Sequence, residues 1–200
     1  MTVEPDGSVS FDLTKGPVKS VSTYVFTNPT DGTLTAYDKF GDDLGYYTEP
    51  LTEQQWTVVE DSTATVIGYQ CFMAESDYHG RHWKAWFTPE IPMPYGPWKL
   101  HGLPGLILKA EADGGFSFLA TGIENSDRLI TPMYLSGDYA KVNRKDALKN
   151  AEYYVNNQEA IMNAQGQSVK IYTLDENSNK VEVPKFDGLK HSIESDYKQK

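Results

Sequence analysis

The feature that most constrains this 200-residue chain is a proline-rich stretch between two segments of alternating hydrophobicity. Five of the eleven prolines stand in it: Pro89, Pro92, Pro94, Pro97 and Pro104. Proline lacks an amide hydrogen and fixes its own φ angle, so this spacing excludes both a helix and a central strand. Long loops without linker composition are uncommon and are typically either functional or structurally exceptional. We therefore expect an ordered, irregular loop with a strand on each side.

Period-two alternation, typical of β-strands, recurs along most of the remaining chain. The sequence predicts strands over 18–26, 33–40, 46–47, 55–60, 66–74, 81–88, 106–112, 116–123, 129–135, 169–174 and 181–183. Turn-forming residues separate them, and Tyr78-His79-Gly80 and Asp113-Gly114-Gly115 are expected hairpin tips. These hairpins make the predicted sheet mainly antiparallel.

A helical pattern dominates only at 143–164, where Asn156-Asn157 is a possible interruption and Gly166 a stop. We predict an α+β, β-rich domain: a mainly antiparallel curved sheet or open barrel with one helix, about 143–164, packed on it. Residues 1–16 are expected to form a loose N-terminal segment and 17–184 a single domain. Residues 185–200 are expected to be a charged tail that frays.

Composition excludes several classes of protein. The formal net charge of −10 argues against binding to nucleic acid, which requires clustered Lys and Arg. No window approaches the ~20 apolar residues of a membrane span. The single Cys71 forbids an internal disulfide, and its place in an alternating apolar run predicts a buried, inert thiol. The first residues show no signal-peptide pattern.

The common catalytic motifs are absent. We find no phosphate-binding or dinucleotide-binding glycine loop, no HExxH helix, no nucleophile elbow and no zinc or iron–sulfur spacing. We therefore predict no cofactor.

The strand predicted at 81–88 carries bulky residues on both faces. Trp83 would point to one face and Trp86 to the other. Since a solvated face does not ordinarily carry a tryptophan, we expect the following proline-rich loop to cover Trp86. The alternative is a partly exposed aromatic of no special role.

Histidine is a frequent metal ligand, and His79 and His82 stand three residues apart with Asp77 beside them. Positions i and i+3 of a strand lie on opposite faces, so His79 would have to lie in the turn itself to converge with His82 or with His101. Because no third ligand is evident, we predict no metal site here.

A second candidate set consists of His101, Glu90 and Arg81, because a buried histidine beside a carboxylate can act as a general base. The alternative, which we favour, is that Glu90 and His101 bind backbone groups of a loop with few amide donors of its own. No nucleophile accompanies them.

The third set is aromatic: Trp83, Trp86, Tyr95 and Trp98. Rings beside prolines could form a platform for a sugar, a peptide or a partner chain, with His101 close by. They could equally form the core of a rigid loop, which is the interpretation we favour.

The stretch around the loop resembles the GLPGLI family, whose naming hexapeptide stands here as Gly102-Leu103-Pro104-Gly105-Leu106-Ile107. The segments Gly68–Cys71, Gly80-Arg81, Ala85–Thr88 and Tyr95–Trp98 are similar to that family too. The family occurs mainly in Bacteroidota, is usually exported behind a signal peptide and has no established activity. The resemblance therefore implies export, with the leader outside this chain, and supplies no catalytic residues.

Three hypotheses follow. The preferred one is a non-catalytic exported domain that binds an envelope protein, peptide or glycan through Trp83, Trp86, Tyr95, Trp98 and His101. The first alternative is a hydrolase-type enzyme using His101, Glu90 and Arg81. The second is a structural module in which the motif serves folding only, so that changes at Pro104 or Gly105 reduce stability alone.

Overall fold

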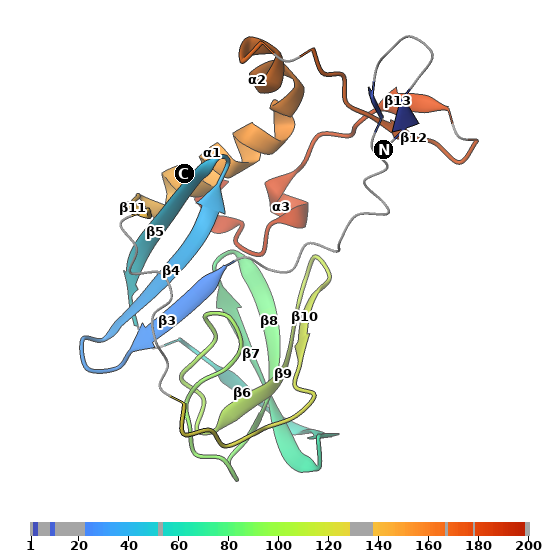
Figure 1. Cartoon of the computed structure of the whole chain (residues 1–200). Coiled ribbons are helices and arrows are strands. Elements are labelled where there is room, and N and C mark those ends of the chain that lie inside the picture. Colours follow the sequence, from blue (N-terminus) through green and yellow to red (C-terminus); the bar gives the residue numbers. More distant parts are fainter. Residues whose placement is uncertain are drawn as a thin grey trace.

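Two antiparallel sheets form the framework of the chain (Figure 1). The computed structural model describes residues 23–51, 54–128, 138–166, 168–177 and 179–198, and the backbone of 2–3 and 9–10. The larger sheet has the strand order β10-β9-β8-β7-β6. Its strands are β6 (Thr57–Val66), β7 (Tyr69–Tyr78), β8 (Arg81–Thr88), β9 (Leu106–Ala112) and β10 (Phe116–Leu119).

Tight turns connect the first three strands of the five-stranded sheet. Ile67 and Gly68 join β6 to β7, and His79 and Gly80 join β7 to β8, all four with positive φ angles. Two residues of positive φ form the turn whose twist matches that of paired strands. The predicted hairpin tip at Tyr78-His79-Gly80 is thus confirmed.

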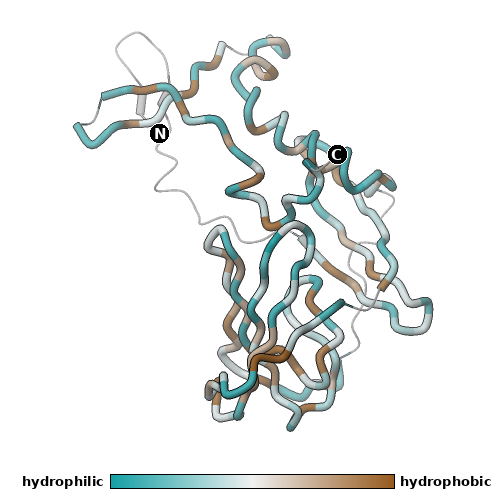
Figure 2. Tube along the Cα trace, turned by 180° about the vertical axis from the view of Figure 1, so that it is seen from behind, coloured by the Kyte–Doolittle hydropathy of each residue, from teal (hydrophilic) through white to brown (hydrophobic). Residues whose placement is uncertain are grey.

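The main core lies on one face of the five-stranded sheet. It consists of Ala74, Trp83, Ala85, Phe87, Leu100, Leu103, Ile107 and Ala110. Leu100 and Leu103 belong to residues 89–105, here called the proline loop, so the loop packs on the face that carries Trp83. Figure 2 shows the hydrophobic positions concentrated in this sheet and its loop.

Our expectation that the proline loop covers Trp86 is wrong. Trp86 lies on the opposite face and packs against a smaller cluster of Val66, Cys71 and Leu108. The Nζ of Lys109 lies 4.1 Å from the centroid of the Trp86 ring. A neighbouring strand therefore shields Trp86, because the lysine stem and charge can cover an aromatic ring. Cys71 is buried, as predicted.

The smaller sheet has the order β11-β5-β4-β3, with β11 parallel to β5 and the other pairs antiparallel. Its strands are β3 (Tyr24–Asn28), β4 (Thr33–Phe40), β5 (Asp43–Pro50) and β11 (Ala140–Lys141). Helix α1 (Arg144–Asn156) packs on it through Ala147, and a second core forms from Leu34, Ala36, Phe40 and Tyr47. This core is separate from the one under the proline loop.

The helical region consists of two helices rather than one. The Asn143 side chain caps α1 by accepting a hydrogen bond from the Asp146 amide at 3.2 Å. The chain then breaks at Asn157 before α2 (Gln158–Ala164), at the predicted interruption. The fold class is confirmed as β-rich with antiparallel sheets, which do not close into a barrel.

The remaining described elements are short. They are β1 (Thr2–Val3), β2 (Val9–Ser10), β12 (Tyr172–Leu174), β13 (Lys180–Glu182), α3 (Gly188–His191) and the 3₁₀ helix η2 (Asp196–Lys198). The hairpin predicted from 169–174 and 181–183 is confirmed by β12 and β13, although β12 begins at Tyr172, three residues later than predicted. The strand predicted at 129–135 lies outside the described residues, as does most of the segment 1–16.

The prediction that the tail from residue 185 frays is wrong. Glu194, Ser195 and Tyr197 are buried. Residues 192–197 run between α1 and the upper end of β8 (Figure 1). A charged composition therefore concealed a segment that packs between the two sheets. Within the described ranges, no helix is at once long and apolar enough to cross a bilayer.

Candidate functional site

An ionic cluster lies where the two sheets, α1 and the C-terminal residues meet. Its members are Glu49, His79, Lys99, Arg144, Glu194 and Asp196. They come from β5, the β7–β8 turn, the proline loop, the first residue of α1 and the end of the chain. The fold thus gathers them from five separate segments.

Lys99 is the most deeply buried charge of the cluster, with a side chain 0% exposed. Its Nζ lies 2.8 Å from Glu194 Oε1, donates to the Tyr47 hydroxyl at 3.0 Å and also binds Glu49. The preceding residue, Trp98, has a φ of 56°, a region that non-glycine residues rarely adopt. This backbone turn lets Trp98 stack in the core while Lys99 faces the cluster.

Arg144 binds the two acidic residues of the C-terminus. One guanidinium nitrogen lies 3.0 Å from Asp196 Oδ1, the other contacts Asp196 Oδ2, and the pair is bidentate. The same side chain contacts Glu194, and its Nε lies 3.2 Å from Glu49 Oε1.

His79 lies in the β7–β8 turn. This is the position that the spacing of the histidines required if His79 was to converge with other ligand-type side chains. Its Nδ1 lies 3.6 Å from Asp196 Oδ2 and 4.0 Å from Glu194 Oε2, and its Nε2 lies 3.5 Å from Glu49 Oε1. Its φ of 50° places the ring against the cluster. Three carboxylates thus face Lys99, Arg144 and the His79 ring.

The electrostatics of the cluster favour the ionised form of its two C-terminal acids, Glu194 and Asp196. Burial opposes ionisation of Glu194, but Lys99, His79 and Arg144 outweigh it and hold its pKa below the ordinary value. Burial is likewise outweighed at Asp196, whose pKa is lowered by hydrogen bonding and charge from His79 and Arg144. The pKa of Tyr47 is raised by its own burial and by the negative charge of Glu194.

The two predicted metal candidates, His79 and His82, lie in different parts of the structure. His79, Glu194 and Asp196 bring ligand-type atoms within 4.8 Å of one another. Both carboxylates, however, already bind Arg144, so a cation would have to compete with the guanidinium. His82 lies elsewhere, with Nδ1 2.8 Å from the exposed Asp77. The structure therefore does not bring His79 and His82 to one site.

The predicted catalytic set is not brought together. Arg81 opens β8 and is buried, and its Nε donates to the Ser192 carbonyl at 3.1 Å. Glu90 follows the other end of β8, is exposed and accepts from the Gln70 amide at 3.4 Å. His101 is buried in the proline loop, with Nδ1 2.8 Å from the Lys99 carbonyl oxygen. Glu90 and His101 thus bind backbone groups.

The aromatic set divides in the same way. Trp83 is fully buried, and the Trp98 ring stacks on it with centroids 5.5 Å apart. Trp86 lies on the opposite face of the sheet, and Tyr95 forms an isolated bridge with His101 inside the loop. Trp83 and Trp98 are therefore core, and the four rings form no common platform.

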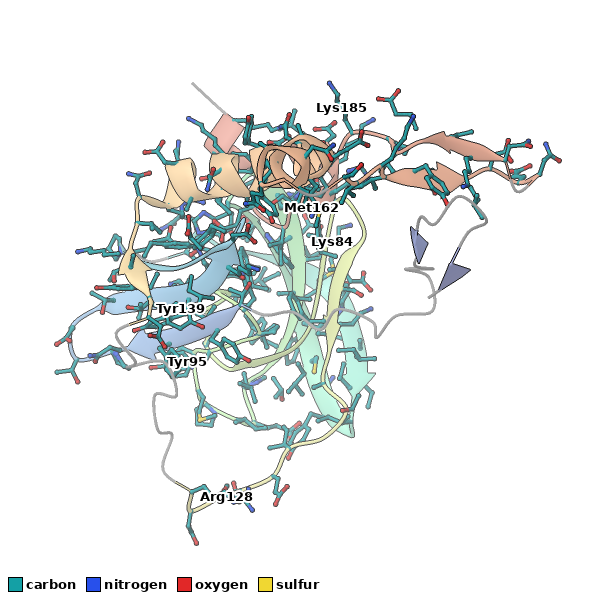
Figure 3. The ribbon with its side chains drawn as sticks, turned by 45° about the horizontal axis from the view of Figure 1, so that its top comes forward. Lys84, Tyr95, Arg128, Tyr139, Met162 and Lys185 are labelled. Atoms are coloured by element: carbon teal, nitrogen blue, oxygen red, sulfur yellow. The ribbon has the colours of Figure 1, made fainter. Side chains whose placement is uncertain are left out.

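An apolar groove lies where the proline loop meets the β9–β10 hairpin. It has a volume of about 320 Å³ and is lined by Gly96, Pro97, Leu106, Ile107, Leu108, Phe118, Leu119, Ala120, Gly122 and Ile123. Leu119 is 63% exposed and Ile123 46% exposed. Beyond the groove the chain continues to Arg128, which Figure 3 shows far from both sheets.

Neither the ionic cluster nor the apolar groove was predicted from the sequence. The groove had a signal: Leu119 is apolar although Phe116 and Phe118 already supply the inward face of that strand. The acids of the ionic cluster had none, because Glu194 and Asp196 stand in a tail whose composition is typical of a solvated segment.

The structure is thus a β-rich domain of two antiparallel sheets. An ionic cluster lies between the sheets, and an apolar groove lies beside the five-stranded sheet. Residues 78–109 match the model of a family described as a protein of unknown function (Porph_ging). No curated protein matches the chain.

Among solved structures, the chain is similar to two crystal forms of PNGF-II. The C2 form has a TM-score of 0.50 and 16% identity, over 64% of this chain and 24% of that one. The P2₁ form has a TM-score of 0.48 and 17% identity, over 64% and 26%. The present chain therefore corresponds to about a quarter of the length of those chains, and the C2 form shows a similar β-rich fold.

Proposed function

We propose that this chain is a non-catalytic binding domain of an exported protein of the bacterial cell envelope, and that the apolar groove holds its partner. The observation that carries the proposal is the exposure of Leu119 and Ile123 along the groove wall. Exposed apolar side chains gathered in a concave place are typical of binding surfaces. The envelope location is supported by the resemblance of Gly102–Ile107 to an exported family.

The groove favours an extended peptide or a protein segment over a glycan. Its lining contains only glycine, proline, alanine and larger apolar residues, which offer no side-chain hydrogen bond to sugar hydroxyls. In the described part of the chain, β10 is the outermost strand at that end of the five-stranded sheet. An extended segment could therefore add to β10 while its apolar side chains enter the groove.

The hydrolase alternative lacks support. Arg81, Glu90 and His101 lie in different places, and two of them already bind backbone carbonyls. A general base needs to reach the proton it removes, and these side chains face no common cleft.

The hypothesis that the motif serves folding only is compatible with the proposal for part of the motif. A Cβ on Gly105 would lie 2.1 Å from the Thr88 carbonyl oxygen, so this glycine is required by packing. Leu106 and Ile107, which complete the hexapeptide, line the groove. The motif thereby both packs the loop and shapes the proposed binding surface.

The test is a selection from a displayed library of random peptides against the wild-type chain, followed by affinity measurements with variants. We expect Leu119→Lys to weaken binding of the selected peptides at least 10-fold. Leu174→Lys is the matched control, since Leu174 is 57% exposed on the distant β12–β13 hairpin. Equal loss in both variants, or none in Leu119→Lys, contradicts the assignment of the groove.

A further inference from the structure

Residues 192–197, here called the C-terminal strap, contact the β7–β8 hairpin through hydrogen bonds of the kind that a receptor makes with a bound peptide. The Ser195 amide donates to the His79 carbonyl at 2.9 Å, and the Ser195 hydroxyl donates to the Gly80 carbonyl at 2.9 Å. Arg81 Nε donates to the Ser192 carbonyl at 3.1 Å. The β7–β8 hairpin thus binds the main chain of the strap at two points and the Ser195 side chain at a third.

The acidic side chains of the strap bind Lys99, Arg144 and His79, and the place that these three residues and Glu49 surround is here called the cleft. Glu194 and Asp196 are held by Lys99, Arg144 and His79, none of which belongs to the strap. Apart from the strap, Glu49 is the carboxylate that faces both Lys99 and Arg144 among the described residues. The cleft alone therefore presents two permanent cations and the His79 ring against one carboxylate, and these three basic groups contact both acidic side chains of the strap.

Glycines allow the close approach between the cleft and the strap. A Cβ on Gly80 would lie 2.5 Å from Ser195 Oγ and 2.7 Å from the Asp196 amide nitrogen. The Tyr197 hydroxyl donates to Glu152 Oε2 at 3.0 Å, so α1 holds the last side chain of the strap. The basic groups of the cleft, its hydrogen bonds to the strap and the close packing at Gly80 all fit one short acidic sequence.

We propose that this cleft is a recognition site for an acidic peptide segment of the Glu-Ser-Asp-Tyr kind, and that the chain's own residues 194–197 occupy it. The intermolecular source of the segment is a second copy of this chain, because residues 194–197 of this chain make the contacts on which the proposal rests. The site is distinct from the apolar groove and does not depend on it. A tethered strap competes with an effective concentration in the millimolar range, so a free segment displaces it from wild type only at similar concentrations and binds more tightly where the strap is weakened.

The experiment uses the full chain and a fluorescent peptide with the sequence of residues 192–198. In the strap-weakened variant Glu194→Gln/Asp196→Asn we expect the peptide to bind about 100-fold more tightly than to wild type, because two charge-assisted anchors of the competitor are lost. Adding Arg144→Gln should abolish this binding. A peptide carrying Gln and Asn at the acidic positions is the matched control and should not bind.

The outcomes separate clearly. Equal binding to wild type and to the strap-weakened variant, or equal binding of the acidic and neutral peptides, overturns the proposal. If the strap-weakened variant does not fold by circular dichroism, hydrogen exchange of the Ser195 amide in wild type decides. Millimolar acidic peptide should accelerate that exchange several-fold by displacing the strap, and no acceleration overturns the proposal.

A second arm identifies the source of the segment. The strap-weakened variant is mixed with wild type, and the mass of the mixture is measured by light scattering. A dimer at micromolar concentration supports a second copy as the source, and persistent monomers with retained peptide binding overturn that source.

Discussion

Gly105 shows how closely the proline loop approaches the end of β8. Its Cβ position lies 2.1 Å from the Thr88 carbonyl oxygen and 2.6 Å from the carbonyl carbon, and both are backbone atoms. We expect Gly105→Ala to lower the free energy of unfolding by about 1–3 kcal/mol or more, since main chain must shift. Urea unfolding measures it. Gly122→Ala, with nothing within 4 Å, is the control and should stay within about 0.5 kcal/mol.

Lys99 is the residue on which the ionic cluster most depends. Lys99→Met removes the cation but leaves Glu49 and the buried Glu194 facing each other. Breaking a buried ion pair on one side typically costs about 3–5 kcal/mol, and we expect a loss of that size in urea unfolding. Lys84→Met is the control, because Lys84 is 49% exposed and its partner Glu75 lies 3.5 Å away. Its effect should stay below about 1 kcal/mol. Similar losses in both variants would contradict the role of burial.

At the scale of elements, the docking of the strap depends on pH. The pKa values of Glu194 and Asp196 in the folded protein lie below their ordinary values of 4.5 and 3.8. The two carboxyl groups therefore bind protons more readily in the unfolded chain than in the folded protein. Their contribution to stability is complete above about pH 5 and is lost as the pH falls through their folded-state pKa values.

We expect the free energy of unfolding to fall steadily between pH 5 and pH 3 in wild type. The variant Glu194→Gln/Asp196→Asn should show a shallower fall, because it lacks these two carboxylates. Some fall remains, because other carboxylates such as Glu152 still contribute. Urea unfolding at a series of pH values measures both slopes. Equal slopes would mean that the strap does not carry this dependence.

At the scale of the whole molecule, the two hydrophobic cores are separate and the ionic cluster lies between them. All four tryptophans, Trp56, Trp83, Trp86 and Trp98, pack with the five-stranded sheet or its loop. Helix α1 packs on the four-stranded sheet. Tryptophan fluorescence and helical circular dichroism therefore report on different halves.

We expect the two signals to give one coincident urea transition at pH 7, because the ionised cluster couples the sheets. In Lys99→Met, or in Glu194→Gln/Asp196→Asn, the midpoints should separate. Coincidence of the two probes is a standard test of two-state unfolding. Midpoints that stay together in both variants would show that the cluster does not couple the halves.

Local patterns predicted the elements well. The strand Thr33–Phe40 and the turn at His79-Gly80 follow from alternation and turn residues that act over a few positions. The break at Asn157 was visible as well. The face on which the proline loop packs was not, because Trp83 and Trp86 look equivalent along the strand and only the position of the loop in space distinguishes them.

The sequence by itself determined the β-rich class, the hairpins and the irregular course of the proline loop, since these follow from backbone sterics and hydrophobic periodicity. Only the tertiary structure decided where the charges meet. Glu49, Lys99, Arg144 and Glu194 are far apart in the chain, and each alone is typical of a solvated surface residue. Their pairing between the two sheets, with Lys99 and Glu194 buried, made the charged tail part of the core, since buried charges persist only when paired.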